Sequence, residues 1–550
     1  MIRHLIYLLG ALWMTLPLGA QPYCSEVWCA DQGNGTFRNP VLHADYSDPD
    51  VVRVGDDYWM TASSFNCIPG LPILHSKDLV NWSLAGYALE ELVPTDFFRQ
   101  PQHGRGVWAP CIKYHDGWYY IYWGDPDFGI YMVKTQHPRG KWEKPVLVKA
   151  GKGLIDPSPL WDDDGRLYLA HAWAGSRSGL NSIISLVELN QEGTACISKE
   201  VMIFDGNDGI NHTIEGAKLY KRNGWYYIFA PAGGVATGWQ VVLRSKDIYG
   251  PYEARIVMAQ NDSPVNGPHQ GAWIETPQGE SWFLHFQDKG TYGRIIHLNP
   301  MKWLDNDWCV IGEDSDGDGC GTPVLNSRLP IGGVSKPCTP QESDEFETRT
   351  LGLQWQWHAN PEDWFSFSSG YGFLRLYASR EKFVNLWSLP NLLLQKFPAE
   401  AFTATTKMRF ASKGQGDSGN LLVMGYDYAR LAITRQGNEA VIELVTCHNA
   451  DRNAPEQRIE LERTSLTRHA SGAIPLYTTD VWFRVKVEQG GICHFAYSLD
   501  GKHFKAIKHP FKARVGKWIG AKVGLCCLNN GGRVDRGWID VDWFRITKND

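Results

Sequence analysis

Three acidic residues stand in short motifs that could place them for acid–base chemistry. Asp48 lies in SDPD, Asp156 in IDPS and Glu215 in IEGA. The proline after each aspartate fixes a backbone angle and removes a competing donor, which predicts that both acids are held in rigid turns. Two carboxyl groups can cleave a glycosidic bond when one protonates the leaving oxygen and the other acts on the opposite face of the sugar. A third acid nearby raises the pKa of the proton donor through like-charge repulsion.

The three acids recur at one position of an internal repeat. Each unit has a strand, a tight polar turn and an aromatic strand, and the five units are VVRVGDDYWMTA (51–62), CIKYHDGWYYIYW (111–123), PLWDDDGRLYLAHAW (159–173), AKLYKRNGWYYIFA (217–230) and AWIETPQGESWFLHF (272–286). Their turns contain Gly, Asn and Asp, which tolerate the positive φ of hairpins. Units of roughly 50 to 60 residues with several short strands predict a five-bladed β-propeller. A long β-sandwich with chance similarity is the weaker interpretation, since the blade ends HSKDLVNW and RSKDIYGPY recur as well.

One distinctive residue precedes the first strand of every unit. The five positions are occupied by Asp48, Trp108, Asp156, Glu215 and His269. Equivalent positions of a propeller are related by its pseudo-rotation axis, so these side chains are predicted to converge at the mouth of the central channel. Such a ring is more typical of an active site than of a core. An Asp-Pro pair alone is typical of a turn or cap, but the register shared with Glu215 favours the catalytic interpretation.

The length and the composition of the chain predict a second domain. A chain of 550 residues is too long for one core. The segment 326–343 is rich in Pro, Gly and Ser and predicts a linker. Residues 344–550 alternate apolar and polar positions over many short strands, which predicts a β-sandwich. The expected organisation is therefore all-β, with a catalytic propeller over 38–325 and an accessory sandwich over 344–550.

The N-terminus and the net charge bear on location and partners. Arg3, a short apolar run and small residues up to Ala20 predict a signal peptide over 1–20 and export to the periplasm or the medium. No second apolar stretch approaches membrane length. The formal charge is −6 and no Lys/Arg-rich run occurs, so nucleic acid is an unfavoured partner. The expected partner is an oligosaccharide substrate, and the oligomeric state is left open.

The cysteines and one acidic turn are the possible disulfide or metal sites of the sequence. Twelve cysteines show no CxxC pair and no zinc spacing. In an oxidising compartment Cys24 could pair with Cys29, and Cys309 with Cys320. The stretch DSDGDGCG (314–321) begins like a calcium loop, but Leu325 occupies the position where an EF-hand needs Glu. An Asp/Gly-rich turn is the favoured interpretation.

The motifs resemble glycoside hydrolase family 43 in order and spacing. The similar stretches are NPVLHADYSDPDVVRVGDDYWMTASSF, GVWAPCIKY, LIDPSPLWDDDGRLYLAHA, IEGAKLYKRNGWYYIFA and GPHQGAWIE, from about residue 38 to 325. Residues 344–550 resemble the lectin-like, concanavalin-like sandwich of the β-xylosidase and α-L-arabinofuranosidase branch. The resemblance implies an inverting mechanism on a five-bladed propeller.

The resemblance also implies roles for the acids. Asp48 is the expected general base and Glu215 the general acid, while Asp156 tunes the pKa of the acid and orients it. Asp50 falls where the family more often has a small residue, so it is expected to be a strand-entry or rim residue without a catalytic role.

Three further residues receive expected roles in the same way. Trp108 belongs to the WAP motif and is expected in the pocket wall. Arg294 is expected to contact substrate or Asp156. His269 matches a channel histidine near a central metal ion or water. No cofactor is required, and the resemblance leaves room for Ca²⁺ in the propeller channel.

The expected activity is the removal of non-reducing-end α-L-arabinofuranosyl residues from arabinoxylan or xyloglucan oligosaccharides. A β-D-xylosidase is the first alternative, although FNCIPG (65–70) stands where xylosidase relatives carry bulkier aromatics. A retaining fructan hydrolase would require NDPNG-like, RDP and EC motifs, where this chain has SDPD, IDPS and IEGA. A non-catalytic carbohydrate-binding protein is disfavoured because all three acids are retained.

Overall fold

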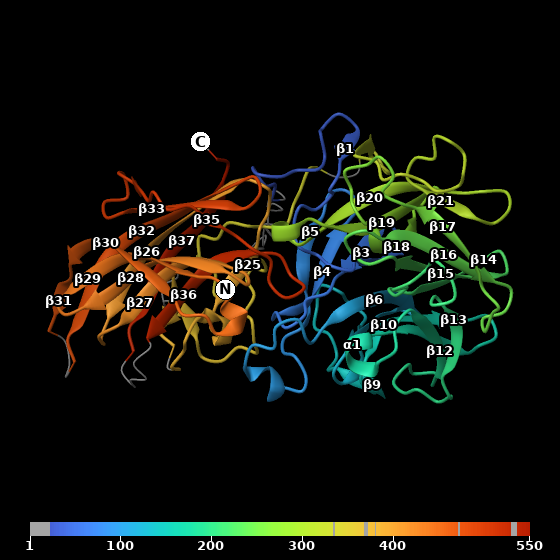
Figure 1. The fold of residues 1–550 in the computed structure, drawn as a ribbon, viewed down its shortest axis with the longest axis horizontal. Coiled ribbons are helices and arrows are strands. Elements are labelled where there is room, and N and C mark those ends of the chain that lie inside the picture. The colour runs from blue at the N-terminus through green and yellow to red at the C-terminus, as the bar shows by residue number, and fades with distance from the viewer. Residues whose placement is uncertain are drawn as a thin grey trace, which may run out of the picture.

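The chain folds into two β-rich bodies that pack side by side, the propeller and the sandwich (Figure 1). The computed structural model describes residues 23–333, 336–367, 372–379, 381–470, 474–529 and 536–549. The predicted signal peptide therefore lies outside the described residues. Within them, no helix has both the length and the apolar character needed to cross a membrane.

Five four-stranded antiparallel sheets form the blades of the propeller, which confirms the predicted fold. In chain order the blades are β2 (Asp50–Val54), β3 (Asp57–Thr61), β4 (Gly70–Ser76) and β5 (Ser83–Leu89); β6 (Trp108–His115), β7 (Trp118–Asp125), β8 (Gly129–Thr135) and β9 (Val146–Ala150); β10 (Leu154–Trp161), β11 (Leu167–Trp173), β12 (Ile183–Leu189) and β13 (Val201–Asp205); β14 (Lys218–Arg222), β15 (Trp225–Ala232), β16 (Trp239–Ser245) and β17 (Glu253–Met258); and β18 (His269–Glu275), β19 (Ser281–Asp288), β20 (Arg294–Trp303) and β21 (Cys309–Ile311). The first strands are neighbours around the channel: β6 contacts β2 and β10, β10 contacts β14, and β18 contacts β2.

The hairpins between the first and second strands follow the turn residues of the repeat. Asp116 and Gly117 both have positive φ, as do Asn223 and Gly224. Two successive residues with positive φ are the signature of a type I′ turn, whose twist matches that of the flanking strands. The turn chemistry thus fixes the register in which each aromatic strand pairs with the innermost strand.

The two ends of the propeller are joined by a short sheet. Strand β1 (Thr36–Arg38) pairs antiparallel with β22 (Asn326–Arg328). The first three residues of the expected linker are therefore a strand that closes the propeller.

The sandwich packs a nine-stranded sheet against a six-stranded sheet. The larger sheet holds β23 (Phe365–Phe367), β24 (Leu374–Tyr377), β26 (Phe402–Ser412), β31 (Thr467–His469), β32 (Leu476–Glu488), β33 (Ile492–Ser498), β34 (Lys505–Ala506), β35 (Phe511–Lys512) and β37 (Trp538–Thr547); the smaller holds β25 (Leu393–Lys396), β27 (Asp417–Met424), β28 (Tyr428–Gln436), β29 (Glu439–Cys447), β30 (Gln457–Ser465) and β36 (Lys522–Asn529). The short helical turns are α1 (Gly175–Ser178), η1 (Phe97–Arg99), η2 (Gly290–Tyr292), η3 (Leu386–Ser388) and η4 (Ala450–Arg452). Alternating apolar side chains such as Phe410, Val541 and Leu431 fill the space between the sheets.

The propeller and the sandwich share part of one core. Tyr292 and Ile295 of the propeller belong to the apolar cluster that fills the sandwich. The Tyr292 hydroxyl donates to the Glu400 carbonyl at 3.0 Å and accepts from the Gly491 N–H at 3.0 Å. These contacts fix the sandwich against the propeller.

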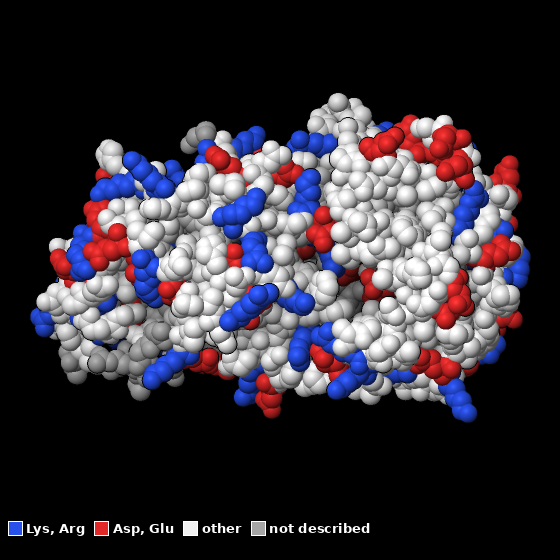
Figure 2. Space-filling model, viewed as in Figure 1, with Lys and Arg blue, Asp and Glu red and all other residues white. Residues whose placement is uncertain are grey.

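On the face drawn in Figure 2, acidic and basic side chains are interspersed over both the propeller and the sandwich.

The two possible disulfide pairs are not bonded in this structure. The sulfur atoms of Cys24 and Cys29 lie 3.7 Å apart without a bond. Cys309 and Cys320 are both free thiols as well.

Candidate active site

The backbone turns Asp48 and Asp156 out of the regular strand pattern. Their φ values are +55° and +56°, in the left-handed region that non-glycine residues seldom occupy. Asp156 lies in β10 where the pairing with β11 shifts between Ile155 and Ser158, which marks a bulge. Bulges re-aim side chains and are frequent beside active sites. The same kind of shift follows Trp108 in β6 and His269 in β18.

Asp48 is held by three donors. Its Oδ2 accepts hydrogen bonds from Ser47 Oγ at 2.8 Å and Ser63 Oγ at 2.5 Å. Arg294, at the start of β20, places Nη1 3.3 Å from Asp48 Oδ1 and 2.6 Å from Ser47 Oγ. Of the two partners expected for Arg294, substrate or Asp156, the acid that it contacts in the structure is Asp48 and not Asp156. The guanidinium complements the negative charge of Asp48 and fixes its orientation.

Asp156 is tied to the backbone next to Glu215. Its Oδ2 accepts the Gly216 N–H at 2.7 Å, and its side chain is buried. Gly216 has a φ of +64°, and a Cβ there would lie 2.8 Å from atoms of Gln270 and Pro231. Only glycine therefore allows this close approach. Burial and the charge of Glu215 raise the pKa of Asp156, against the lowering effect of the Gly216 N–H.

Glu215 is the accessible acid of the three. About a third of its side chain (35 %) is exposed. Burial, and then the charge of Asp48, raise the pKa of Glu215 to about 7. A carboxyl group with this pKa keeps its proton in a substantial fraction of molecules near neutral pH.

His269 lies beside Glu215 and is neutral near pH 7. Its Nε2 is 3.4 Å from Glu215 Oε1, and the ring is fully buried. Burial, and then the charge of Arg294, lower the pKa of His269 to about 3. The described side chains around His269 do not offer three His, Cys, Asp or Glu donor atoms within 4.8 Å of one another; such a group occurs at Asp314, Asp316 and Asp318.

An aromatic wall stands beside the acids. The Trp108 indole N–H donates to the Gly104 carbonyl at 3.0 Å, and its ring meets Phe65 edge-on at 6.2 Å. Trp518 of the sandwich lies 6.0 Å from the Trp108 ring and 5.8 Å from the Arg294 guanidinium. Trp518 and Arg294 line one recess between the two domains. The sequence repeat could not predict Trp518 as a site residue, because Trp518 lies in the sandwich and not in one of the five repeated units.

Asp50 occupies the strand-entry position expected for it and does not lie at the rim. It is the first residue of β2, as a strand-entry residue would be, but its side chain is fully buried. Its Oδ2 accepts the Ile112 N–H of β6 at 2.7 Å. Its Oδ2 also lies 3.9 Å from Nζ of the buried Lys218, a partner that the local pattern SDPD could not show.

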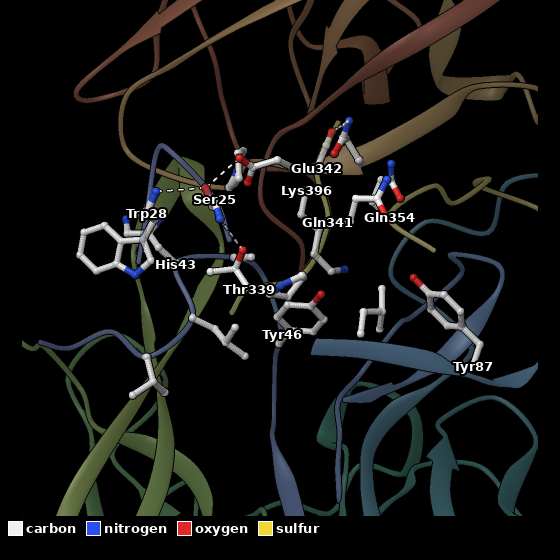
Figure 3. Close-up of a pocket in the computed structure, with 17 residues that line it drawn as sticks. Ser25, Trp28, His43, Tyr46, Tyr87, Thr339, Gln341, Glu342, Gln354 and Lys396 are labelled. Carbon is white, nitrogen blue, oxygen red and sulfur yellow. Dashed lines mark hydrogen bonds between the residues drawn. The ribbon is translucent and has the colours of Figure 1, made fainter. Parts of the chain in front are cut away.

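A second recess at the domain interface is separate from the acids. Figure 3 shows its lining, in which Ser25 Oγ donates to Glu342 Oε1 at 2.7 Å and the Ser25 N–H donates to Thr339 Oγ1 at 2.8 Å. Asp48, Asp156 and Glu215 are absent from the residues that line this recess. The candidate active site is therefore the channel mouth and not the recess of Figure 3.

The five-bladed propeller with acids at its channel mouth, joined to a β-sandwich, places the protein among glycosidases. Residues 37–309 match the model of glycosyl hydrolases family 43, and residues 343–547 match that of the β-xylosidase C-terminal concanavalin A-like domain. A putative β-xylosidase of Xylanibacter ruminicola is 36 % identical over 500 residues, which cover 90 % of this chain and 87 % of the relative. The chain belongs to glycoside hydrolase family 43.

Two further comparisons extend over nearly the whole chain. The non-reducing end α-L-arabinofuranosidase BoGH43B of Bacteroides ovatus is 27 % identical over 538 residues, with 92 % of this chain and 94 % of the relative covered. The crystal structure of the GH43 BlXynB protein from Bacillus licheniformis superimposes with a TM-score of 0.76 at 27 % identity, covering 94 % of this chain and 100 % of that one. The similarity includes both domains.

Proposed function

We propose that this glycosidase is exo-acting and inverting, and that it removes a non-reducing-end pentosyl residue, α-L-arabinofuranosyl or β-D-xylosyl, from hemicellulose oligosaccharides. The observation that carries the proposal is the convergence of Asp48, Asp156 and Glu215 from three blades, each in a different electrostatic environment. An acid and a base contributed by different blades can flank the sugar from opposite sides.

Asp48 acts as the general base in the proposed reaction. Ser47, Ser63 and Arg294 hold its carboxylate in one orientation. From there it accepts a proton from the water that attacks the anomeric carbon on the face opposite the leaving group. Attack by water in a single displacement inverts the anomeric configuration.

Glu215 acts as the general acid. Its raised pKa keeps the proton available near neutral pH, and its partial exposure allows it to reach the leaving oxygen. Asp156 fixes the backbone at Gly216 and repels a negative charge on Glu215. Neutral His269 lies against Glu215 without adding a positive charge that would lower its pKa.

The two candidate sugars follow from the printed names of the relatives. The Xylanibacter ruminicola relative is called a putative β-xylosidase, and the Bacteroides ovatus relative a non-reducing end α-L-arabinofuranosidase. Both names describe pentose substrates, and the rings of Trp108 and Trp518 suit the flat apolar face of a sugar ring. The apolar N-terminal segment supports export, which would bring the enzyme to plant oligosaccharides outside the cell.

The test is a comparison of 4-nitrophenyl α-L-arabinofuranoside and 4-nitrophenyl β-D-xyloside, with kcat/KM measured for each. We expect release from at least one, and proton NMR of the first-formed sugar should show the inverted anomer. The Asp48→Ala variant should be folded and nearly inactive on both. Retention of configuration would contradict the roles given to Asp48 and Glu215, and fructose release from a fructan would favour the retaining alternative. Binding without turnover would favour a carbohydrate-binding protein.

A further inference from the structure

A segment of the propeller, residues 65–69, connects the candidate active site to the sandwich. At one end, Phe65 exchanges two backbone hydrogen bonds of 3.0 and 3.1 Å with Val107, the residue before Trp108. Near the other end, Ile68 exchanges two of 2.9 and 2.6 Å with Trp357 of the sandwich. This bridging segment therefore pairs both with the chain just before Trp108 and with the second domain.

Asn66 lies in the bridging segment and bonds to both sides through one side chain. The residue is 1 % exposed, and its Nδ2 donates to the His358 carbonyl of the sandwich at 2.7 Å. Its Oδ1 accepts the Gly104 N–H in a longer bond of 3.4 Å. The Gly104 carbonyl in turn accepts the indole N–H of Trp108 at 3.0 Å. One buried amide thus links the sandwich to the residue that holds Trp108, and its loss would leave buried polar groups unpaired.

Gly104 also meets the loop of the sandwich that carries Trp518. Its φ is +72°, and a Cβ at this position would lie 2.9 Å from Trp518 Cδ1 and closer still to the side chain of Lys517. Only glycine allows this approach. The rings of Trp108 and Trp518 lie 6.0 Å apart. A displacement of Gly104 would therefore disturb the contacts of both aromatic residues.

The backbone at Phe65 needs support from its surroundings. Its φ is +51°, in the left-handed region, where a bulky residue is strained. Such a conformation persists only where neighbouring contacts hold it. The pairing with Val107 holds Phe65 itself, and the bond from Asn66 to His358 holds the next residue. Loss of the Asn66 side chain should let the bridging segment relax and shift Val107 with it.

We propose that Asn66 is a positioning residue for substrate binding. It fixes Gly104 against the sandwich and so holds the rings of Trp108 and Trp518 in the arrangement that contacts the sugar. The hydrogen bonds that the structure describes for its side chain reach the sandwich and Gly104, and none of the three acids. Asn66 therefore acts on the binding of substrate and leaves proton transfer unchanged. The inference rests on the proposed function, because that function gives the two rings a sugar to bind.

The experiment compares kcat and KM of the wild type and Asn66→Ala on the unactivated oligosaccharide that the wild type cleaves best. Asn66→Ala should raise KM about tenfold and change kcat by less than about threefold, because the acids keep their places while the aromatic contacts are lost. The alkaline limb of the pH profile should stay in place. Asn66→Ser, which keeps a hydroxyl group, is the second variant in case Asn66→Ala does not fold, and it should raise KM about threefold.

Asn360 provides a matched control at the same domain interface. It lies in the sandwich, is 5 % exposed, and exchanges bonds of 2.7 and 2.9 Å with the Leu92 backbone of the propeller. Asn360→Ala removes the same kind of buried bond at a place outside the bridging segment. It should lower the Tm by several degrees and leave KM within about twofold of the wild type. Equal rises in KM in the Asn66 and Asn360 variants would show a general loosening of the domains and overturn the inference.

A double-mutant cycle with Trp518→Ala tests the path through the aromatic rings. If Asn66 acts by holding the rings, its replacement by Ala should raise KM about threefold or less in the Trp518→Ala background, instead of about tenfold. Independent contributions would multiply, so a full tenfold rise in that background would overturn the inference. Folded Asn66 variants with an unchanged KM, or with a loss confined to kcat, would also overturn it. An inactive wild type would instead refute the proposed function.

Discussion

Replacement of Glu215 by Gln removes the proposed proton donor while it preserves the size of the side chain. The pKa of Glu215 is raised to about 7 by burial and by the charge of Asp48. A group with that pKa is about nine-tenths protonated at pH 6 and about one-tenth protonated at pH 8. If Glu215 is the acid, kcat/KM of the wild type on an unactivated oligosaccharide falls roughly tenfold between these two pH values.

The size of the expected loss follows from the same assignment. General acid catalysis contributes about 10²- to 10⁴-fold, so Glu215→Gln should lose that factor in kcat on an oligosaccharide at pH 6. This corresponds to about 2.7 to 5.5 kcal/mol in activation free energy. On a dinitrophenyl pentoside the loss should be less than about tenfold, because the leaving group departs as an anion.

The assay combines reducing-sugar release from the oligosaccharide with absorbance of the aryl leaving group, each from pH 4 to 9. The wild-type alkaline limb should disappear in Glu215→Gln, which has no proton to lose at that position. Circular dichroism at each pH serves as the control for folding. A variant that kept an alkaline limb near pH 7 on the oligosaccharide would show that another group donates the proton.

Three further predictions follow from the site. Asp48→Asn should lower kcat on every substrate by about 10²- to 10⁴-fold, irrespective of the leaving group, because the attacking water loses its base; a loss confined to poor leaving groups would argue against this role. Asp156→Asn should raise the Tm by several degrees at pH 8 and little at pH 4: the raised pKa of Asp156 means that its ionised form is disfavoured in the folded state, so stability falls as pH rises. Calorimetry at both pH values checks this, and an equal change at each would contradict it. Trp518→Ala should raise KM by up to about tenfold and change kcat less, since the aromatic wall binds substrate without reacting; an unchanged KM would show that Trp518 does not meet the sugar.

The fold and the ring of acids were predictable because they belong to a repeat. The residues Asp116-Gly117 and Asn223-Gly224 predict hairpin turns, because Asp, Asn and Gly tolerate positive φ. The recurrence of the unit places Asp48 and Glu215 at equivalent positions. Equivalent residues of the repeat are related by the propeller axis, and the channel runs along that axis. Residues at one equivalent position in several blades therefore meet at the channel mouth.

The remaining features depend on contacts between distant segments. The strand-entry position expected for Asp50 is confirmed, whereas the rim alternative does not hold, because the side chain is fully buried. The pattern SDPD cannot show that Lys218, from another blade, accompanies Asp50 in a buried site. The bulge at Asp156 within β10 arises where the pairing of β10 with β11 shifts, and the sequence of β10 alone does not show that pairing. Trp518 lies in the second domain, and its approach to Arg294 depends on how the two domains dock.

The position of Trp518 has a consequence for how such enzymes can be recombined. One wall of the pocket is encoded in the propeller and another in the sandwich. The Gly520 N–H donates to Asp45 Oδ2 at 2.9 Å, so the segment that carries Trp518 docks three residues before Asp48, the proposed base. A chimera that joined this propeller to the sandwich of a relative would therefore exchange part of the sugar-contacting surface. Substrate preference should be inherited from both parents, and variants selected for a new substrate should carry changes in both halves of the gene.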